Sequence, residues 1–281
     1  LNRESDRSKK AEEDLKALVK EKGAATNVEA IACDLQDFES VRGAIKTIKD
    51  KYDSIDVLCN NAGVMALADT ATKDGYDVQM QTNHLSHFLL TKELFPLLQK
   101  AKELRGEARI VHHSSGARHA QFGTGGGALK PEYFEKKGGD LGGDGSSMIF
   151  GGARWQRYHQ TKLANSVFTH ALSTKLKDTG IKAAVAAPGL AATNLQVTTG
   201  EGMGSSMWIM KFSQSAEDGA MPLLACCFDP ATENGDFWEP NSIGNVKGLA
   251  TKVKWDGLST SEDSAKILWE KSEEACGKFD I

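Results

Sequence analysis

The chain has 281 residues, of which 40% are hydrophobic and 26% charged, and its formal net charge is −4 at pH 7. These totals are typical of a globular protein, and the weakly acidic balance argues against a nucleic-acid-binding protein. No apolar run approaches the roughly 18 residues of a membrane-spanning helix. The five cysteines include no C-x-x-C pair, which favours reduced thiols in an intracellular, reducing compartment over a disulfide framework.

The first half of the chain alternates between helical and extended segments. Apolar residues at helical spacing predict helices over residues 8–22, 38–53 and 76–104. Continuous apolar runs predict buried strands over residues 28–35, 55–59 and the start of 109–117. This order predicts an α/β fold, a doubly wound and mostly parallel sheet with helices on both faces. Ligands bind such sheets beyond the carboxyl ends of the strands.

The second half continues the alternation around two Gly-rich segments. Residues 118–154 predict a Gly-rich insertion loop at the surface. A helix is expected from Tyr158, then a strand that ends in Pro188 and Gly189, and a helix over residues 215–228. Residues 190–214, rich in Gly and Met, are expected to line an apolar substrate site or to pack on the core. No repeat or linker divides the chain, so we predict a single domain over residues 1–281.

The segment YHQTK at residues 158–162 suggests catalysis. Tyr158 and Lys162 are four residues apart, so on a helix their side chains lie on one face, one turn apart. A nearby ammonium favours the phenolate and lowers the pKa of the phenol from its usual value of about 10. The pair therefore suits general acid/base catalysis, although two ordinary residues of an amphipathic helix would show the same spacing.

Six short motifs occur in the order of one protein family. They are CDL at 33–35, NNAG at 60–63, TNH at 82–84, HHSSGA at 112–117, YHQTK at 158–162 and PG-x-x-x-T at 188–193. Together they resemble the short-chain dehydrogenase/reductase superfamily, over essentially the whole chain. The stretches YHQTKLANSVF, EDGAMP and G-x-F-W-x-P look like its retinol-dehydrogenase and WW-domain-oxidoreductase-like branch. The resemblance implies a Rossmann-like fold and an oxidoreductase.

The resemblance also implies a role for each catalytic position. Tyr158 would be the general acid in carbonyl reduction and the base in alcohol oxidation. Lys162 would lower the pKa of Tyr158 and hydrogen-bond the nicotinamide ribose. Ser115, the second serine of its pair, would hydrogen-bond the substrate oxygen, and Asn83 would anchor a water relay from Lys162 to solvent. These residue types suit a reaction in which hydride comes from a cofactor and a proton from the protein.

A second set of residues is expected to bind the cofactor. The resemblance implies contacts from Arg3, Asp34, Leu35, Asn60, Ala62, Gly63, Tyr158, Lys162, Pro188, Gly189 and Thr193. A basic residue at Arg3, just after the second strand of this fold, favours the 2′-phosphate of NADP, with NAD as the other option. Two plain alternatives stay open here: Arg3 as a solvated charge, and Asp34 as a helix N-cap.

The chain departs from the family pattern at its start. The strand and the T-G-x-x-x-G-x-G turn that hold the cofactor diphosphate in this family have no counterpart in the sequence. We therefore expect an N-terminally truncated Rossmann-like domain, which lacks the first strand, the turn, the first helix and most of the second strand. It is either a fragment of a longer product or a natural chain without this unit. We expect the chain as it stands to bind the cofactor weakly and its activity to be doubtful.

The leading functional hypothesis is an NADP(H)-dependent enzyme that interconverts an alcohol and an aldehyde or ketone, small or lipophilic. The alternative is a catalytically impaired dinucleotide sensor or scaffold of the same fold. Metal binding is not expected, because the histidines lack a completing Cys or carboxylate at ligand spacing. A hydrolase reading of Ser115 fails because HHSSG lacks the first glycine of a nucleophile elbow. A homo-oligomer is compatible with the sequence.

Overall fold

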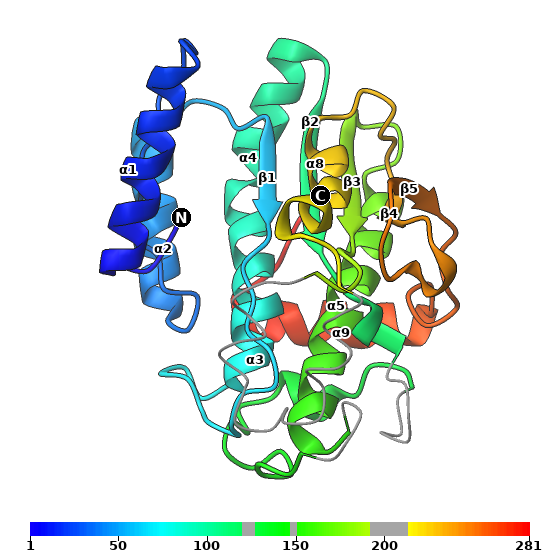
Figure 1. The fold of residues 1–281 in the computed structure, drawn as a ribbon. Coiled ribbons are helices and arrows are strands. Elements are labelled where there is room, and N and C mark those ends of the chain that lie inside the picture. The colour runs from blue at the N-terminus through cyan, green and yellow to red at the C-terminus, as the bar shows by residue number, and fades with distance from the viewer. Residues whose placement is uncertain (120–126, 147–150, 192–212) are drawn as a thin grey trace.

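The centre of the fold is a mostly parallel sheet (Figure 1). The computed structural model describes residues 1–119, 127–146, 151–191 and 213–281. Among these residues one sheet has the order β1-β2-β3-β4-β5, with the bounds Val57–Asn60, Ala108–His113, Ile181–Ala186, Phe237–Pro240 and Ala250–Val253. The first four strands run parallel, and β5 pairs antiparallel with β4. The predicted α/β fold is confirmed.

Helices follow the predicted order along the chain. The α-helices are α1 (Asp6–Glu21), α2 (Phe38–Lys51), α3 (Val78–Met80), α4 (Ser86–Arg105), α5 (Ala153–Lys175), α8 (Ala216–Phe228) and α9 (Glu262–Cys276). A π-helical turn, η1 (Gln81–Leu85), joins α3 to α4, and 3-10 turns are η2 (Gly116–His119), η3 (Pro131–Phe134) and η5 (Ile243–Asn245). Helix α5 begins at Ala153, after Gly152 at positive φ, rather than at Tyr158 as predicted.

The two faces of the sheet bury different helices. Ile110 and Ala183 belong to the large core cluster that includes the inner faces of α2, α4, α5 and α9. Their neighbours Val111 and Ala184 point the other way and pack with Cys226 of α8. Because successive side chains of a strand alternate between faces, continuous apolar runs are needed to fill both cores.

The predicted strand over residues 28–35 is wrong in extent. Only Ala32 forms a bridge, to Asn2, held by backbone hydrogen bonds from Asn2 N to Ile31 O at 3.2 Å and from Cys33 N to Asn2 O at 2.9 Å. A strand extends only as far as its neighbour pairs with it. Here the neighbour is the short extended segment before α1, and β1 is an edge strand of the sheet.

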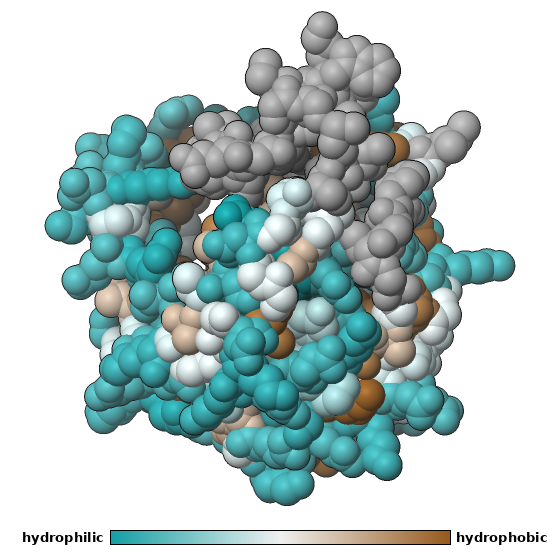
Figure 2. Space-filling view, turned by 90° about the horizontal axis from the view of Figure 1, so that it is seen from below, coloured by the Kyte–Doolittle hydropathy of each residue, from teal (hydrophilic) through white to brown (hydrophobic). Residues whose placement is uncertain are grey.

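The surface is polar on the face that Figure 2 shows. Seen from below, the described surface is mainly hydrophilic, with apolar residues in small separate spots. Helix α1 buries none of its residues, and its Leu15 and Leu18 are exposed, although the sequence predicted an amphipathic helix. Among the described helices, none is both long and apolar enough to cross a membrane.

Candidate active site

A cavity of about 1160 Å³ lies at the carboxyl ends of β1, β2 and β3. The predicted residues that line it are Arg3, Asp34, Leu35, Asn60, Ala62, Gly63, Ser115, Tyr158, Lys162, Pro188 and Gly189. Asn83 is buried and absent from the lining, and Thr193 lies outside the described residues, as do most of residues 190–214. The volume lies slightly above the range of about 300–1000 Å³ that is usual for small-molecule sites.

Helix α5 carries Tyr158 and Lys162 into this cavity. Each is 5% exposed, and the Lys162 ammonium lies 5.8 Å from the centroid of the Tyr158 ring. Lys162 Nζ donates to the backbone carbonyl of His113 at the end of β2, at 2.9 Å. The helix is anchored to the same strand by Asn165 Nδ2, which donates to that carbonyl at 2.9 Å. The strand end therefore fixes the height of the two side chains over the sheet.

The protonation of Tyr158 is set by burial. Loss of water raises the pKa of Tyr158 to about 12, and a hydrogen bond with the Ser115 side chain only partly opposes this. The predicted lowering of this pKa by Lys162 is not seen. The physical reason is that Lys162 directs its ammonium at the His113 carbonyl and is itself disfavoured as a charge. Near neutral pH the phenol is therefore protonated, which is the form that a proton donor needs.

Lys162 links the site to the stability of the protein. Burial lowers the pKa of Lys162 from 10.5 to about 8. The unfolded chain keeps the ordinary value, so it binds more protons between about pH 8 and about pH 10.5, and stability rises with pH across that window. Below about pH 8, Lys162 is charged in both states, and the whole cost of burying that charge lowers the free energy of unfolding.

We therefore expect Lys162→Met to stabilise the fold near neutral pH. The free energy of unfolding should rise by about 1–3 kcal/mol, because a buried charge is removed, and the gain should disappear near about pH 10.5. Urea unfolding of both proteins at the two pH values measures this. An equal gain in the free energy of unfolding at both pH values would contradict the claim that the buried charge of Lys162 destabilises the fold.

Both serines of the pair line the cavity, but their hydroxyls have different partners. Ser114 is 1% exposed, and its hydroxyl donates to the Lys162 carbonyl at 2.8 Å. Ser115 follows at the start of the turn η2, lines the cavity, and hydrogen-bonds Tyr158. The prediction that the second serine faces the site is thus consistent with the geometry.

Asn83 lies in the π-helical turn η1 and is fully engaged within the protein. Its side chain accepts from Val64 N at 2.7 Å and donates to Val64 O at 2.8 Å and to Thr161 Oγ1 at 2.9 Å. A Cβ atom on Gly63 would lie 3.2 Å from Asn83 Oδ1 and 3.4 Å from Lys162 Nζ. Asn83 therefore ties the loop after β1 to α5, and Gly63 leaves room for that contact.

The far end of the cavity contains Arg3, Asp34 and Asn60. Asp34 is half-buried, and its Oδ1 accepts from Gln36 N at 2.9 Å. It is not a helix N-cap, because Asp37 caps α2. Asn60 is 2% exposed, and its Nδ2 hydrogen-bonds Thr91 Oγ1 and His112 Nε2, each at 3.0 Å. Asn60 thus braces the strand ends from inside, while Arg3 is exposed beside the cavity.

The loop after β3 approaches the cavity closely at Gly189. This residue has a φ of 69°, and a Cβ atom there would lie 2.8 Å from the Asn245 carbonyl and would also collide with the Val246 carbonyl. Leu190 N donates to that Val246 carbonyl at 2.7 Å. The loop is therefore held against η5, and glycine is required at this position.

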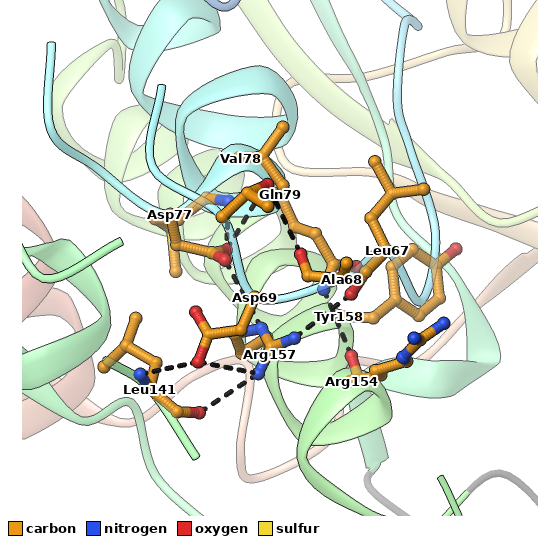
Figure 3. A network of polar contacts seen from close by, with 12 residues as sticks. Leu67, Ala68, Asp69, Asp77, Val78, Gln79, Leu141, Arg154, Arg157 and Tyr158 are labelled. Atoms are coloured by element: carbon orange, nitrogen blue, oxygen red, sulfur yellow. Dashed lines mark hydrogen bonds and ion pairs between the residues drawn. The ribbon is translucent and has the colours of Figure 1, made fainter. Parts of the chain in front are cut away.

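Sequence reasoning missed a buried arginine next to Tyr158 in the chain. Arg157 has no exposed side-chain surface. It forms ion pairs with Asp69, at 3.5 Å from Nη1 to Oδ2, and with Asp77, at 3.3 Å from Nε to Oδ2 (Figure 3). It also donates to the carbonyls of Leu141 at 3.1 Å and Gly143 at 2.8 Å. Arg157 thus connects α5 to the loop after β1 and to the Gly-rich insertion. No periodicity signals it, because its partners are loop residues.

Comparison with known proteins places the chain in a family. The family model for short chain dehydrogenases matches residues 5–126. An uncharacterized oxidoreductase of Schizosaccharomyces pombe is 36% identical over 172 residues, which cover 60% of this chain and 47% of that protein. Human retinol dehydrogenase 11 is 30% identical over 241 residues, 85% of this chain and 66% of that protein. The chain belongs to the short-chain dehydrogenase/reductase superfamily. Its predicted likeness to the retinol-dehydrogenase branch is confirmed by human retinol dehydrogenases 11 and 13.

Solved structures share the fold of this short-chain dehydrogenase/reductase. A crystal structure of a protein from Mycobacterium paratuberculosis matches with a TM-score of 0.63 and 27% identity, over 96% of this chain and 83% of that one. A carbonyl reductase from chicken fatty liver with bound NADPH matches with a TM-score of 0.55, over 88% of this chain and 85% of that one. At 20% identity, this match is evidence of a shared fold alone. The chain spans 47% of the S. pombe relative and 56% of a Penicillium rubens short-chain dehydrogenase/reductase.

Proposed function

We propose that the cavity is the active site of an NADP(H)-dependent oxidoreductase that interconverts an alcohol and an aldehyde or ketone. The observation that carries the proposal is the convergence of Ser115, Tyr158 and Lys162 on one cavity, with the serine hydrogen-bonded to the tyrosine. The names of relatives such as retinol dehydrogenase 11 support the same reaction class. A hydroxyl can polarise a carbonyl oxygen by donating a hydrogen bond, and a protonated phenol beside it can supply the proton.

Each residue has a distinct task in this scheme. Ser115 hydrogen-bonds the substrate oxygen and aligns it with Tyr158. Tyr158 donates its proton to that oxygen during reduction and takes it back during oxidation. With a pKa of about 12 the phenol of Tyr158 is protonated near neutral pH, which is the form that reduction uses, whereas oxidation uses the phenolate and becomes faster as the pH rises. Lys162 supplies the buried positive charge. Asn83, which hydrogen-bonds Val64 and Thr161 of α5, anchors the proposed water relay from Lys162 to solvent.

The residues present fit the adenosine and nicotinamide ends of a nicotinamide dinucleotide, whereas the glycine turn that holds the diphosphate in this family has no counterpart in the sequence. Arg3 and Asp34 line the same cavity as Tyr158, and its volume suits a cofactor together with a substrate. When bound, such a cofactor supplies or accepts hydride at the substrate carbon. Lys162 keeps N–H groups besides the one that His113 engages, so it can also bind a ribose hydroxyl.

An apolar substrate suits the wall beside Tyr158. Met65, Ala66 and Trp155 pack in one buried cluster with Tyr158, and Ala117 packs against it. Met65 and Trp155 line the cavity. Apolar lining around a few convergent polar groups is the usual form of a small-molecule site. We infer that the substrate carries its carbonyl on a hydrophobic body.

The choice of NADP over NAD is assigned to Arg3. A guanidinium at the adenosine end of the cavity favours a 2′-phosphate. We expect Arg3→Glu to weaken NADPH binding about tenfold or more while changing NADH binding little, since one attraction becomes a repulsion. Fluorescence titration of both cofactors measures this. The control is Lys10→Glu, the same charge change on the exposed side of α1; equal effects of the two variants would contradict a specific role of Arg3.

A further inference from the structure

A second buried arginine lies directly behind the proposed catalytic serine. Arg118, in the turn η2, is 4% exposed, and its Nη1 donates to the Ser115 backbone carbonyl at 3.1 Å. The same nitrogen donates to Glu239 Oε1 at 2.7 Å, and Arg118 Nε donates to Asp256 Oδ2 at 2.9 Å. The guanidinium also lies over the ring of Phe237, 4.4 Å from its centroid. Four separate groups therefore fix this side chain.

The partners of Arg118 are themselves held on the rigid part of the fold. Glu239 is 2% exposed and belongs to β4. Asp256 accepts from Ser259 N at 2.9 Å, and Ser259 Oγ lies within hydrogen-bond distance of both Asp256 Oδ2, at 3.0 Å, and Ser166 Oγ of α5, at 2.9 Å, with one proton to donate to either. Burial raises the pKa of Asp256, but the hydrogen bonds from Arg118 and Ser259 outweigh it and hold the pKa below its usual range. Both side chains are therefore held in place beside Arg118.

The contacts continue from Glu239 to the other side of the cavity. Asn245 Nδ2 donates to Glu239 Oε2 at 2.5 Å. The next residue, Val246, accepts from Leu190 N at 2.7 Å and lies against Gly189. Arg118, Glu239 and Asn245 all line the same cavity as Ser115 and Gly189. One chain of contacts thus joins the serine turn to the Pro188–Gly189 loop.

We propose that Arg118 is a positioning residue, which fixes the Ser115 turn and, through Glu239 and Asn245, sets it relative to the Pro188–Gly189 loop. The inference rests on the carbonyl/alcohol function proposed above. The planar fork of arginine is needed, because one side chain reaches the Ser115 carbonyl and two carboxylates at once. A lysine keeps the charge but cannot make the three bonds in these directions. Loss of the fork would let the serine hydroxyl drift from the substrate oxygen.

A double-mutant cycle tests the proposal. The kcat and KM for aldehyde reduction and the affinity for NADPH are measured for wild type, Arg118→Lys, Ser115→Ala and the double variant. We expect Arg118→Lys to lower kcat about tenfold in wild type and less than about twofold in the Ser115→Ala background, because both changes remove the same interaction. The control Arg109→Lys, at a buried arginine paired with Glu107 at the opposite end of β2, should leave kcat unchanged.

Different outcomes overturn different claims. If Ser115→Ala lowers kcat and Arg118→Lys lowers it by the same factor in both backgrounds, the positioning role is overturned while the proposed function stands. If Ser115→Ala leaves kcat unchanged, the catalytic assignment of Ser115 fails, and the positioning role fails with it. Thermal unfolding monitors the fold of every variant. If Arg118→Lys does not fold, Glu239→Gln replaces it in the cycle, because glutamine keeps the side-chain shape but weakens the ion pair with Arg118. If Glu239→Gln and Ser115→Ala then lower kcat by independent factors, the positioning role is also overturned.

Discussion

Tyr158→Phe is expected to lower kcat for carbonyl reduction by about 100- to 10,000-fold, the usual contribution of a general acid. The phenol is the proposed proton donor in the cavity, with a pKa of about 12, and Ser115 hydrogen-bonds to it. Phenylalanine keeps the ring that packs against Trp155, so the fold should be preserved. Loss of NADPH absorbance with an aldehyde panel gives kcat, and fluorescence titration gives the NADPH affinity, which should change little.

Tyr133→Phe is the matched control for that measurement. Tyr133, in η3, is 7% exposed and outside the cavity lining, so the same atom is removed from a buried tyrosine away from the site. We expect its kcat to equal that of wild type. A Tyr158→Phe protein that turns over as fast as the Tyr133→Phe protein would rule out Tyr158 as the proton donor.

Arg157→Met is expected to cause the largest loss of stability among the changes considered. Arg157 has no exposed side-chain surface, and its removal leaves Asp69 and Asp77, both 2% exposed or less, without their cation. Breaking a buried ion pair by deleting one partner costs about 3–5 kcal/mol. Urea unfolding measures the difference. The control is Arg154→Met on the same helix, whose 33% exposed side chain pairs with Asp144; it should cost about 1 kcal/mol or less.

The same network predicts a rescue and a pH dependence. Burial raises the pKa of Asp77 to about 6, against the pull of two backbone hydrogen bonds and of Arg157. Asp77→Asn in the Arg157→Met protein removes the unpaired charge but keeps an oxygen for the amides of Gln79 and Met80, so it should recover part of the loss. Without Arg157 the carboxylate protonates more readily, so the loss should also be smaller at about pH 5 than at about pH 8. An equal loss at both would contradict the charge explanation.

Spacing and motif order were enough to predict which side chains meet. Asp34, Gly63, Ser115 and Tyr158 are distant in the sequence, yet all line one cavity. The reason for Gly63 and Ser115 is that parallel strands bring their carboxyl ends to one edge of the sheet, so the residues that follow β1 and β2 arrive at the same place, where α5 adds Tyr158. The helix expected over residues 215–228 is α8, and its start depends on a similarly local contact, because the Ser215 side chain accepts the cap bond from Asp218 N.

Features that depend on distant partners could not be predicted. The pKa of Tyr158 follows from burial by the folded core, which no four-residue spacing expresses. Arg118 and Arg157 contact loop carbonyls and carboxylates that share no period with them. The strand expected over residues 28–35 reduces to one bridge at Ala32, because strand length is set by pairing and not by composition.

The central claim is that this cavity joins hydride transfer to proton donation by Tyr158. Its most direct test supplies the full chain with NADPH that carries deuterium in place of its transferable hydrogen, together with a mixed panel of aliphatic and aromatic aldehydes. Mass spectrometry of the alcohols then shows whether the label was transferred to carbon. The account predicts one deuterium in the alcohol from wild type and almost none from Tyr158→Phe in the same time. Alcohol without deuterium, or equal labelling by the two proteins, would contradict it.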